Sequence, residues 1–229
     1  MPVLDDIPFE LDLDALMDRA HVQPGGEDAA AFADLLSRAA AVGRPKAIYR
    51  ECYIDAKGED TVTIEGVSFT SRALRTKLDQ AERVFAYVVT CGPEVCETEV
   101  PPGDFLAEFW LDTIKAALLG VSMSHLNTYL NERHALGKTT SMSPGAGDVS
   151  VWPIEQQREL FSLLGDVEAQ IGVRLTDSFL MMPIKSVSGI FFPTEVRFES
   201  CQLCPRENCI GRRSPYDPEL AKKYQSAKA

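Results

Sequence analysis

One long helical segment in the middle of the chain restricts the fold more than any other feature. Pro101-Pro102-Gly103 precede Asp104, a residue type that favours the helix N-cap, and helical spacing then continues to about His134. The first half of this segment is apolar almost all round, with Phe105, Leu106, Phe109, Trp110, Ile114, Leu118 and Leu119. A helix that is apolar on every side is usually buried. We therefore expect residues 104–134 to form a central, buried helix.

The segments on either side of this helix predict a mixture of further helices and strands. Apolar residues at helical spacing predict helices at residues 27–42, 72–78 and 155–164. Runs rich in β-branched residues predict strands at residues 47–56, 61–66, 84–90 and 180–192, the last one broken at Pro183. The order lacks the regular alternation of βαβ units, so it favours an α+β fold with a twisted, largely antiparallel sheet flanked by helices.

Composition and charge exclude several classes of function. The chain has 229 residues, enough for one core or for two small lobes that share one. Its 34 acidic and 23 basic residues give a net charge of −11, which argues against a nucleic-acid partner. No apolar run reaches the ~18–20 residues that span a bilayer, and the acidic N-terminus lacks the features of a signal peptide. We expect a cytoplasmic protein with no membrane partner.

Two segments between residues 143 and 189 have the composition of the walls of a small-molecule site. The first is Ser143-Pro144-Gly145-Ala146-Gly147-Asp148, whose glycines permit close backbone approach to a ligand. It does not fit the G-x-G-x-x-G dinucleotide fingerprint. The second ends in Ser186-Val187-Ser188-Gly189, which places two hydroxyls on one face of a strand. On these residues alone, an ordinary connecting loop and a solvated strand face remain open as alternatives.

Together with Trp152-Pro153 and Arg174-Leu175-Thr176-Asp177, these segments resemble the reactivation domain of cobalamin-dependent methionine synthase. The resemblance is ordered from Ser143 to about Phe198, looser over residues 80–140 and absent beyond Ser200. It implies a domain that binds S-adenosylmethionine and holds it over a corrin, where reduced cobalt is remethylated. It also implies an activation-domain-like α+β domain over residues 1–200, followed by a cysteine-containing extension over residues 201–229.

Three positions that hold the cofactor in this family carry small residues here. The resemblance places the arginine for the cofactor carboxylate at Ser141, a tyrosine at Ala146 and an acidic residue of the long helix at Ser124. A serine cannot replace the forked contact between a guanidinium and a carboxylate. Either another residue such as Arg174 or Lys185 substitutes, or the protein binds S-adenosylmethionine poorly or not at all. Arg174 and Asp177 can instead form a simple ion pair. The predicted cofactor-binding residues are Ser141, Ser143, Pro144, Gly145, Ala146, Arg174, Ser186, Ser188 and Gly189.

The resemblance implies two functions, which the sequence leaves open. The first is reductive remethylation of a cobalamin-type cofactor on a separate corrinoid-binding protein or methionine synthase core, with S-adenosylmethionine as methyl donor and an external electron donor. The second is a non-catalytic partner of a corrinoid protein that has lost S-adenosylmethionine binding. No Ser/His/Asp arrangement and no pair of carboxylates indicates a catalytic residue in either case.

A second motif follows at the C-terminus. Cys201, Cys204 and Cys209 form a C-x2-C-x4-C run, which is typical of zinc or iron–sulfur sites because the C-x2-C turn lets two thiolates reach one ion. Zinc would be structural, whereas an iron–sulfur cluster would supply a one-electron relay. Free or redox-active thiols are the alternative. The candidates for a fourth ligand are Cys52, Cys91 and Cys96, and the arginines that would offset thiolate charge are Arg206, Arg212 and Arg213.

Overall fold

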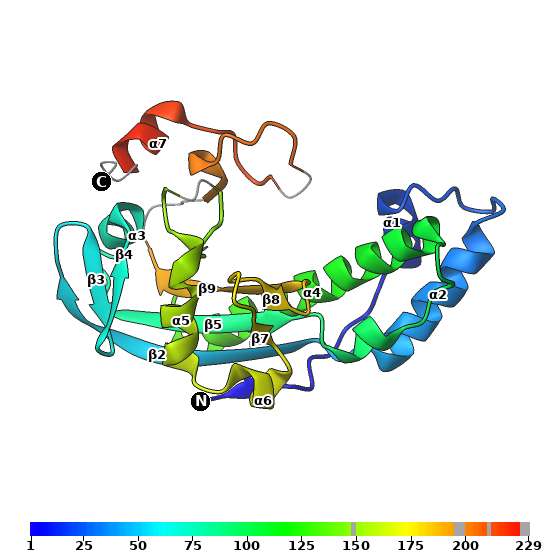
Figure 1. Cartoon of the computed structure of the whole chain (residues 1–229), viewed down its shortest axis with the longest axis horizontal. Helices are drawn as coiled ribbons and strands as arrows, with labels where there is room; N and C mark the ends of the chain where they lie inside the picture. The colour runs from blue at the N-terminus through cyan, green and yellow to red at the C-terminus, as the bar shows by residue number, and fades with distance from the viewer. Residues whose placement is uncertain (148–149, 195–199, 210–211, 225–229) are drawn as a thin grey trace.

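The structure, a computed structural model, describes residues 1–147, 150–194, 200–209 and 212–224. Among these residues the main element is a seven-stranded antiparallel sheet. Its strands run in the order β4 (Val67–Thr70), β3 (Thr61–Ile64), β2 (Lys46–Lys57), β5 (Arg83–Thr90), β9 (Ser186–Pro193) and β6 (Thr139–Met142), with β1 (Val3–Leu4) paired to β2. The sheet and its flanking helices confirm the predicted α+β class (Figure 1).

Strand β5 is the central strand that its sequence predicts. Every residue after Arg83 is buried, as expected for a β-branched and aromatic run that is covered on both faces. It pairs with β2 on one side and with β9 on the other, where Thr90 lies opposite Ser186 and Val88 opposite Ser188. The core of the sheet therefore fixes the position of both serines.

Helix α4 (Phe105–His134) begins at the predicted cap, because the Asp104 carboxylate accepts a hydrogen bond of 3.0 Å from the Ala107 backbone N–H. Its C-terminal half covers one face of the sheet, where Leu126 and Leu130 pack against aromatic residues of β2 and β5. Its N-terminal half extends past the sheet and packs against α1 (Leu13–Arg19) and α2 (Ala29–Val42), as Figure 1 shows.

The prediction that the first half of α4 is buried all round is wrong. Phe105, Leu106 and Phe109 are 77%, 47% and 45% exposed. Trp110 and Ile114 are buried in the lobe formed with α1 and α2. Two helices cover only one side of α4, so an apolar surface on its other side has no neighbour among the described residues.

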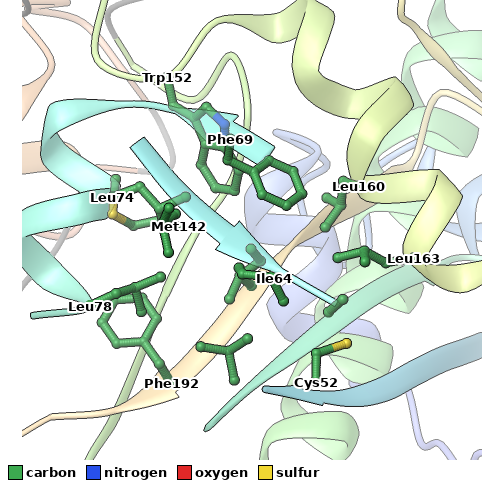
Figure 2. Packing of buried hydrophobic residues seen from close by; sticks show 14 of the residues in the cluster. Cys52, Ile64, Phe69, Leu74, Leu78, Met142, Trp152, Leu160, Leu163 and Phe192 are labelled. Carbon is green, nitrogen blue, oxygen red and sulfur yellow. The ribbon is translucent and has the colours of Figure 1, made fainter. Parts of the chain in front are cut away.

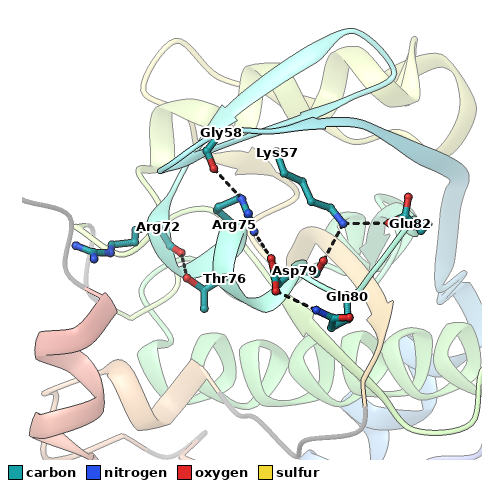
Figure 3. Close-up of polar contacts among 8 residues, drawn as sticks. All are labelled: Lys57, Gly58, Arg72, Arg75, Thr76, Asp79, Gln80 and Glu82. Atoms are coloured by element: carbon teal, nitrogen blue, oxygen red, sulfur yellow. Dashed lines mark hydrogen bonds and ion pairs between the residues drawn. The ribbon is translucent and has the colours of Figure 1, made fainter.

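The opposite face of the sheet carries α3 (Arg72–Lys77), α5 (Gln157–Leu164) and α6 (Val167–Ile171). Figure 2 shows the core beneath them, where the Phe69 and Trp152 rings meet edge to face with centroids 5.9 Å apart. A polar network ties α3 to the β2–β3 turn: Arg75 donates to the Gly58 carbonyl and bonds Asp79, each at 2.8 Å (Figure 3).

Several short elements complete the fold. The predicted helix at 155–164 begins as a 3₁₀ turn, η2 (Ile154–Gln156), and continues as α5. The predicted break at Pro183 is confirmed, because β8 (Met181–Met182) pairs with β7 (Arg174–Leu175) in a separate two-stranded sheet while β9 joins the main one. The remaining short elements are η1 (Glu94–Glu97), η3 (Ser200–Leu203) and α7 (Pro218–Tyr224).

The C-terminal segment packs onto the sheet domain. Leu203, Ala221 and Tyr224 are buried in the same hydrophobic cluster as Trp152 and the core of the sheet. The division of the chain at residues 200 and 201 remains a prediction, but the two parts share this core. None of the helices in the described part of the chain combines the length and apolar character that a bilayer crossing requires.

Candidate functional site

The main candidate site lies at an open edge of the sheet. Strand β6 pairs with β9 only over Ile190–Pro193, so the edge of β9 from Ser186 to Gly189 has no strand partner on that side. At this point the chain leaves β6 and forms the loop from Ser143 to Gly147. A cavity of about 1080 Å³, here called the edge cavity, lies between the loop, the β9 edge, α4 and the C-terminal segment.

The edge cavity collects most of the residues that the sequence predicts for cofactor binding. Seven of the nine line it: Ser141, Ser143, Pro144, Gly145, Ala146, Ser186 and Ser188. One face of α4 also lines it, through Gly120, Met123, Ser124 and Asn127. Ser141, Ala146 and Ser124, the three small residues at family anchor positions, therefore all line one cavity.

The loop is held in a tight conformation. Gly145 has a φ of +73°, a Cβ on it would lie 2.9 Å from Ile154 side-chain atoms, and its N–H donates to the Trp152 carbonyl at 2.8 Å. The far end of the loop is fixed by Ser71, whose hydroxyl donates to the Val151 carbonyl at 2.6 Å. A glycine is needed at position 145 because this φ and this contact both exclude a side chain.

The two β9 serines line the cavity, but their hydroxyls bond protein groups. Ser186 Oγ lies 2.9 Å from Thr90 Oγ1 and 2.7 Å from the Pro183 carbonyl oxygen. Ser188 Oγ lies 2.8 Å from Gln157 Oε1, and the Gln157 amide donates to the Phe179 carbonyl. These hydroxyls therefore stabilise the wall of the cavity rather than present free donors to it.

Gly189 is not a lining residue, but it shapes the wall. A Cβ at Gly189 would lie 2.5 Å from the Met142 carbonyl oxygen and 2.8 Å from both Ser143 Oγ and Tyr87 Oη. Only a residue without a side chain leaves room for the Tyr87 hydroxyl there. Tyr87 itself lines the edge cavity, which its place in an apolar central strand did not indicate.

The structure places the predicted substitutes for the missing arginine elsewhere. Arg174 is exposed on β7, outside the residues that line the cavity, and forms no ion pair with Asp177. Lys185 forms an ion pair of 2.9 Å with Asp112 on α4 and does not line the cavity either. The charged residues among the described lining residues are Arg206 and Arg213, which the sequence reading linked only to thiolate charge.

The C-terminal segment closes the cavity with the cysteine run. Cys201, Cys204 and Cys209 line the cavity with Pro205 and the two arginines. Arg212 organises this segment, because its guanidinium donates to the carbonyls of Cys201, Cys204, Arg206 and Ser214. Figure 1 shows the segment in orange beside the yellow-green loop that precedes α5.

The cysteines are not arranged as a metal centre. Across residues 1–147, 150–194, 200–209 and 212–224, no group of three or more His, Cys, Asp or Glu side chains could hold a metal ion. The candidates for a fourth ligand lie elsewhere: Cys52 is buried in the sheet core, and Cys91 is buried in the helical lobe near Cys96. The described structure gives no support to the zinc or iron–sulfur prediction.

The geometry defines an α+β domain with a ligand-sized cavity at the sheet edge, and two comparisons with known proteins show what this domain is similar to. A sequence model of the activation domain of vitamin B12-dependent methionine synthase matches residues 131–209. This range holds the loop, β9 and the cysteine run, so it passes Ser200, where the sequence reading ended the resemblance. No curated protein matches the chain significantly.

The fold comparison agrees with the family match. The structure is similar to the "Crystal Structure of the MetH Reactivation Domain bound to AdoHcy", with a TM-score of 0.55 and 15% sequence identity. The similarity covers 87% of this chain and 81% of that chain. The predicted resemblance to the activation domain of cobalamin-dependent methionine synthase is thereby confirmed, and the fold is that of the reactivation domain.

Proposed function

We propose that the protein supports reductive remethylation of a corrinoid cofactor that is held by a separate protein, with S-adenosylmethionine bound in the edge cavity as methyl donor. One observation carries this proposal: three segments that are far apart in the sequence line the same cavity. The loop at 141–146, the β9 edge and the Gly120–Asn127 face of α4 are the segments that the resemblance assigns to the cofactor.

The cavity also suits the size and polarity of such a ligand. A volume of about 1080 Å³ exceeds the usual range for small-molecule pockets of ~300–1,000 Å³ only slightly. Its lining combines backbone and hydroxyl groups of the loop with apolar side chains such as Met123, Met181 and Phe191. Such a mixture can hold both an adenosine and an amino-acid end.

The proposed reaction has two steps, a one-electron reduction and a methyl transfer. An external donor gives one electron to cob(II)alamin on the partner, which yields cob(I)alamin. The cobalt electron pair then forms a bond to the sulfonium methyl, while the methyl–sulfur bond breaks and its electrons stay on sulfur as S-adenosylhomocysteine. The residues of this chain bind and orient the donor, which lowers the entropic part of the barrier.

The test combines a binding measurement with a transfer assay. Calorimetry with S-adenosylhomocysteine, the unreactive product, should show one site per chain. A cob(II)alamin-loaded corrinoid protein, a chemical reductant and methyl-labelled S-adenosylmethionine should then give labelled methylcobalamin faster when this protein is present. Absence of both binding and label transfer would exclude the proposal.

A second function is favoured by the lining itself. Ser141, Ala146 and Ser124 replace the three polar anchors of the family, which suggests a non-catalytic partner that binds a corrinoid protein without S-adenosylmethionine. The variant S141R/A146Y distinguishes the two. If the wild-type protein binds the corrinoid protein but not S-adenosylmethionine, and S141R/A146Y gains affinity for S-adenosylmethionine, the second function is favoured. The cavity would then have been kept while its anchoring side chains were lost.

A further inference from the structure

We infer that Tyr87, Arg206 and Arg213 form an anion-binding group in the edge cavity, through which the C-terminal segment binds the ligand carboxylate in place of an arginine at Ser141. This inference rests on the proposed function, because it names the groups that hold one end of the same ligand. Three independent features of the cavity support it.

The first feature is a buried hydroxyl without a partner. The side chain of Tyr87 is fully buried, and its ring stacks on Phe191 with centroids 4.5 Å apart. The Ser141 and Ser143 hydroxyls lie close enough to influence its Oη, but no group in the described structure completes a hydrogen bond of good geometry to it. Buried polar atoms are rarely left unpaired, and an exception calls for an explanation such as a bound water, an ion or a functional role. Burial raises the pKa of Tyr87, so at neutral pH its hydroxyl keeps its proton and can donate to an anion.

The second feature is the pair of arginines that line the same cavity. Arg213 is one of them. Burial raises the pKa of Tyr87, and the Ser141 and Ser143 hydroxyls and then the Arg213 charge lower it. Arg206 also lines the cavity, and its guanidinium forms no hydrogen bond or ion pair with a described residue. A guanidinium presents a planar fork of donors that matches a carboxylate.

The third feature is the local charge. The chain carries a net charge of −11, yet no Asp or Glu occurs among the described residues that line the cavity. Positive charge on one wall of a concave site attracts the anionic group of a ligand and repels its cationic groups, so it orients a ligand that carries both. The carboxylate is the one anionic group of S-adenosylmethionine at neutral pH, so this end of the ligand should lie at Tyr87 and the arginines.

The C-terminal segment is held firmly enough to act as a wall. The guanidinium of Arg212 bonds four carbonyls of the segment, and the Asp217 N–H donates to the Gln202 carbonyl at 2.9 Å. Leu203 is 2% exposed and packs into the sheet core. Arg206 and Arg213 therefore belong to a C-terminal segment whose described residues bond one another and pack against the domain.

The test uses two ligands that differ by one group. S-Adenosylhomocysteine and its decarboxylated analogue share the adenosine, the thioether and the amine, but only the first carries a carboxylate. Calorimetry with the wild-type chain should show at least about 10-fold tighter binding of S-adenosylhomocysteine, as a charge-assisted contact predicts. The variants Y87F, R206Q and R213Q should each reduce this preference, while R19Q, a matched charge change on exposed α1, should not.

Tyr87→Phe separates a binding role from a structural one. Removal of one unpaired oxygen should leave the ring stacked on Phe191, so the melting temperature should stay constant or rise while affinity for S-adenosylhomocysteine falls about 10-fold. Equal binding of both ligands by the wild-type chain, or an unchanged preference in all three variants, overturns the inference and leaves the proposed function intact. If neither ligand binds the wild-type chain or S141R/A146Y, the proposed function fails and the inference falls with it.

Discussion

The edge cavity has two walls of different chemistry. The sheet wall, formed by β6, the 143–147 loop, the β9 edge and one face of α4, is electrically neutral, and the two β9 serines bond protein groups. The tail wall, formed by the described residues 201–209 and 212–213, carries all three cysteines and both arginines that line the cavity. The sheet wall thus supplies neutral groups, while the tail wall carries the charge.

This difference shows that the shape of the cavity and its charge come from separate segments of the chain. The neutral positions Ser141, Ala146 and Ser124 all lie on the sheet wall, where the resemblance places polar anchors. Antiparallel pairing and packing fix the backbone there, and these do not depend on which side chains face the cavity. Charged side chains can therefore reach the same space from another segment without a change in the sheet.

The largest effect should come from a side chain on the sheet wall. Gly189→Ala places a Cβ 2.5 Å from the Met142 carbonyl oxygen and 2.8 Å from Tyr87 Oη. The backbone of a hydrogen-bonded sheet can move aside only at a large cost in free energy. We therefore expect the unfolding free energy, measured by urea titration, to fall by ~2–4 kcal/mol. The control is Gly120→Ala on α4, where an added Cβ has no atom within 4 Å. This substitution should stabilise the helix by ~0.5–1 kcal/mol, because alanine loses less conformational freedom than glycine on folding. A neutral G189A would mean that β9 can move away from β6.

The next effect should come from the tail wall. Leu203→Ala removes a side chain that is 2% exposed in the shared core, which should cost ~2–3 kcal/mol. Because Leu203 anchors the segment that carries Arg206, affinity for S-adenosylhomocysteine should fall together with stability, and limited proteolysis should cut near residue 203. If stability falls but affinity does not, the tail wall takes no part in binding.

The sequence predicted the sheet wall well and the tail wall poorly. The loop, the β9 serines and the long helix are local patterns with recognisable spacing, so each could be placed before the fold was known. Arg206 and Arg213 join the cavity through the packing of Leu203 and the Arg212 bonds, whereas Tyr87 joins it beside Gly189, its partner on β9. All of these are contacts between distant segments. The exposed side of α4 was missed for a similar reason, because an apolar helix does not reveal how many neighbours it has.

A third prediction compares Cys96, beside the helical lobe, with Cys52 in the core of the sheet. A hydrogen bond from Cys91 lowers the pKa of Cys96 to about 6, and Lys115 adds to this effect, whereas burial raises the pKa of Cys52 to about 11. A thiolate forms above the pKa and is the reactive species. Alkylation of exposed Cys96 should therefore accelerate as the pH rises through about 6 and level off by pH 7–8, with Cys52 unreactive. The measurement is a pH series of iodoacetamide labelling with peptide mass spectrometry, and a Cys96 midpoint near the ordinary thiol value would contradict it.

The smallest expected effect is the response of the tail wall to metal removal. Because the cysteines that line the cavity are not arranged to hold a metal ion, chelator should leave the melting temperature unchanged within error. Cys201, Cys204 and Cys209 should all react with a thiol reagent in the folded, anaerobically purified protein. The control is C204S, which should match the wild type in melting temperature, because a thiol that holds no metal contributes little beyond its packing. One zinc per chain, or iron with sulfide, together with protected thiols, would show that the three cysteines close around a metal, and that the tail wall is a metal-held lid rather than one anchored by Arg212 and Leu203.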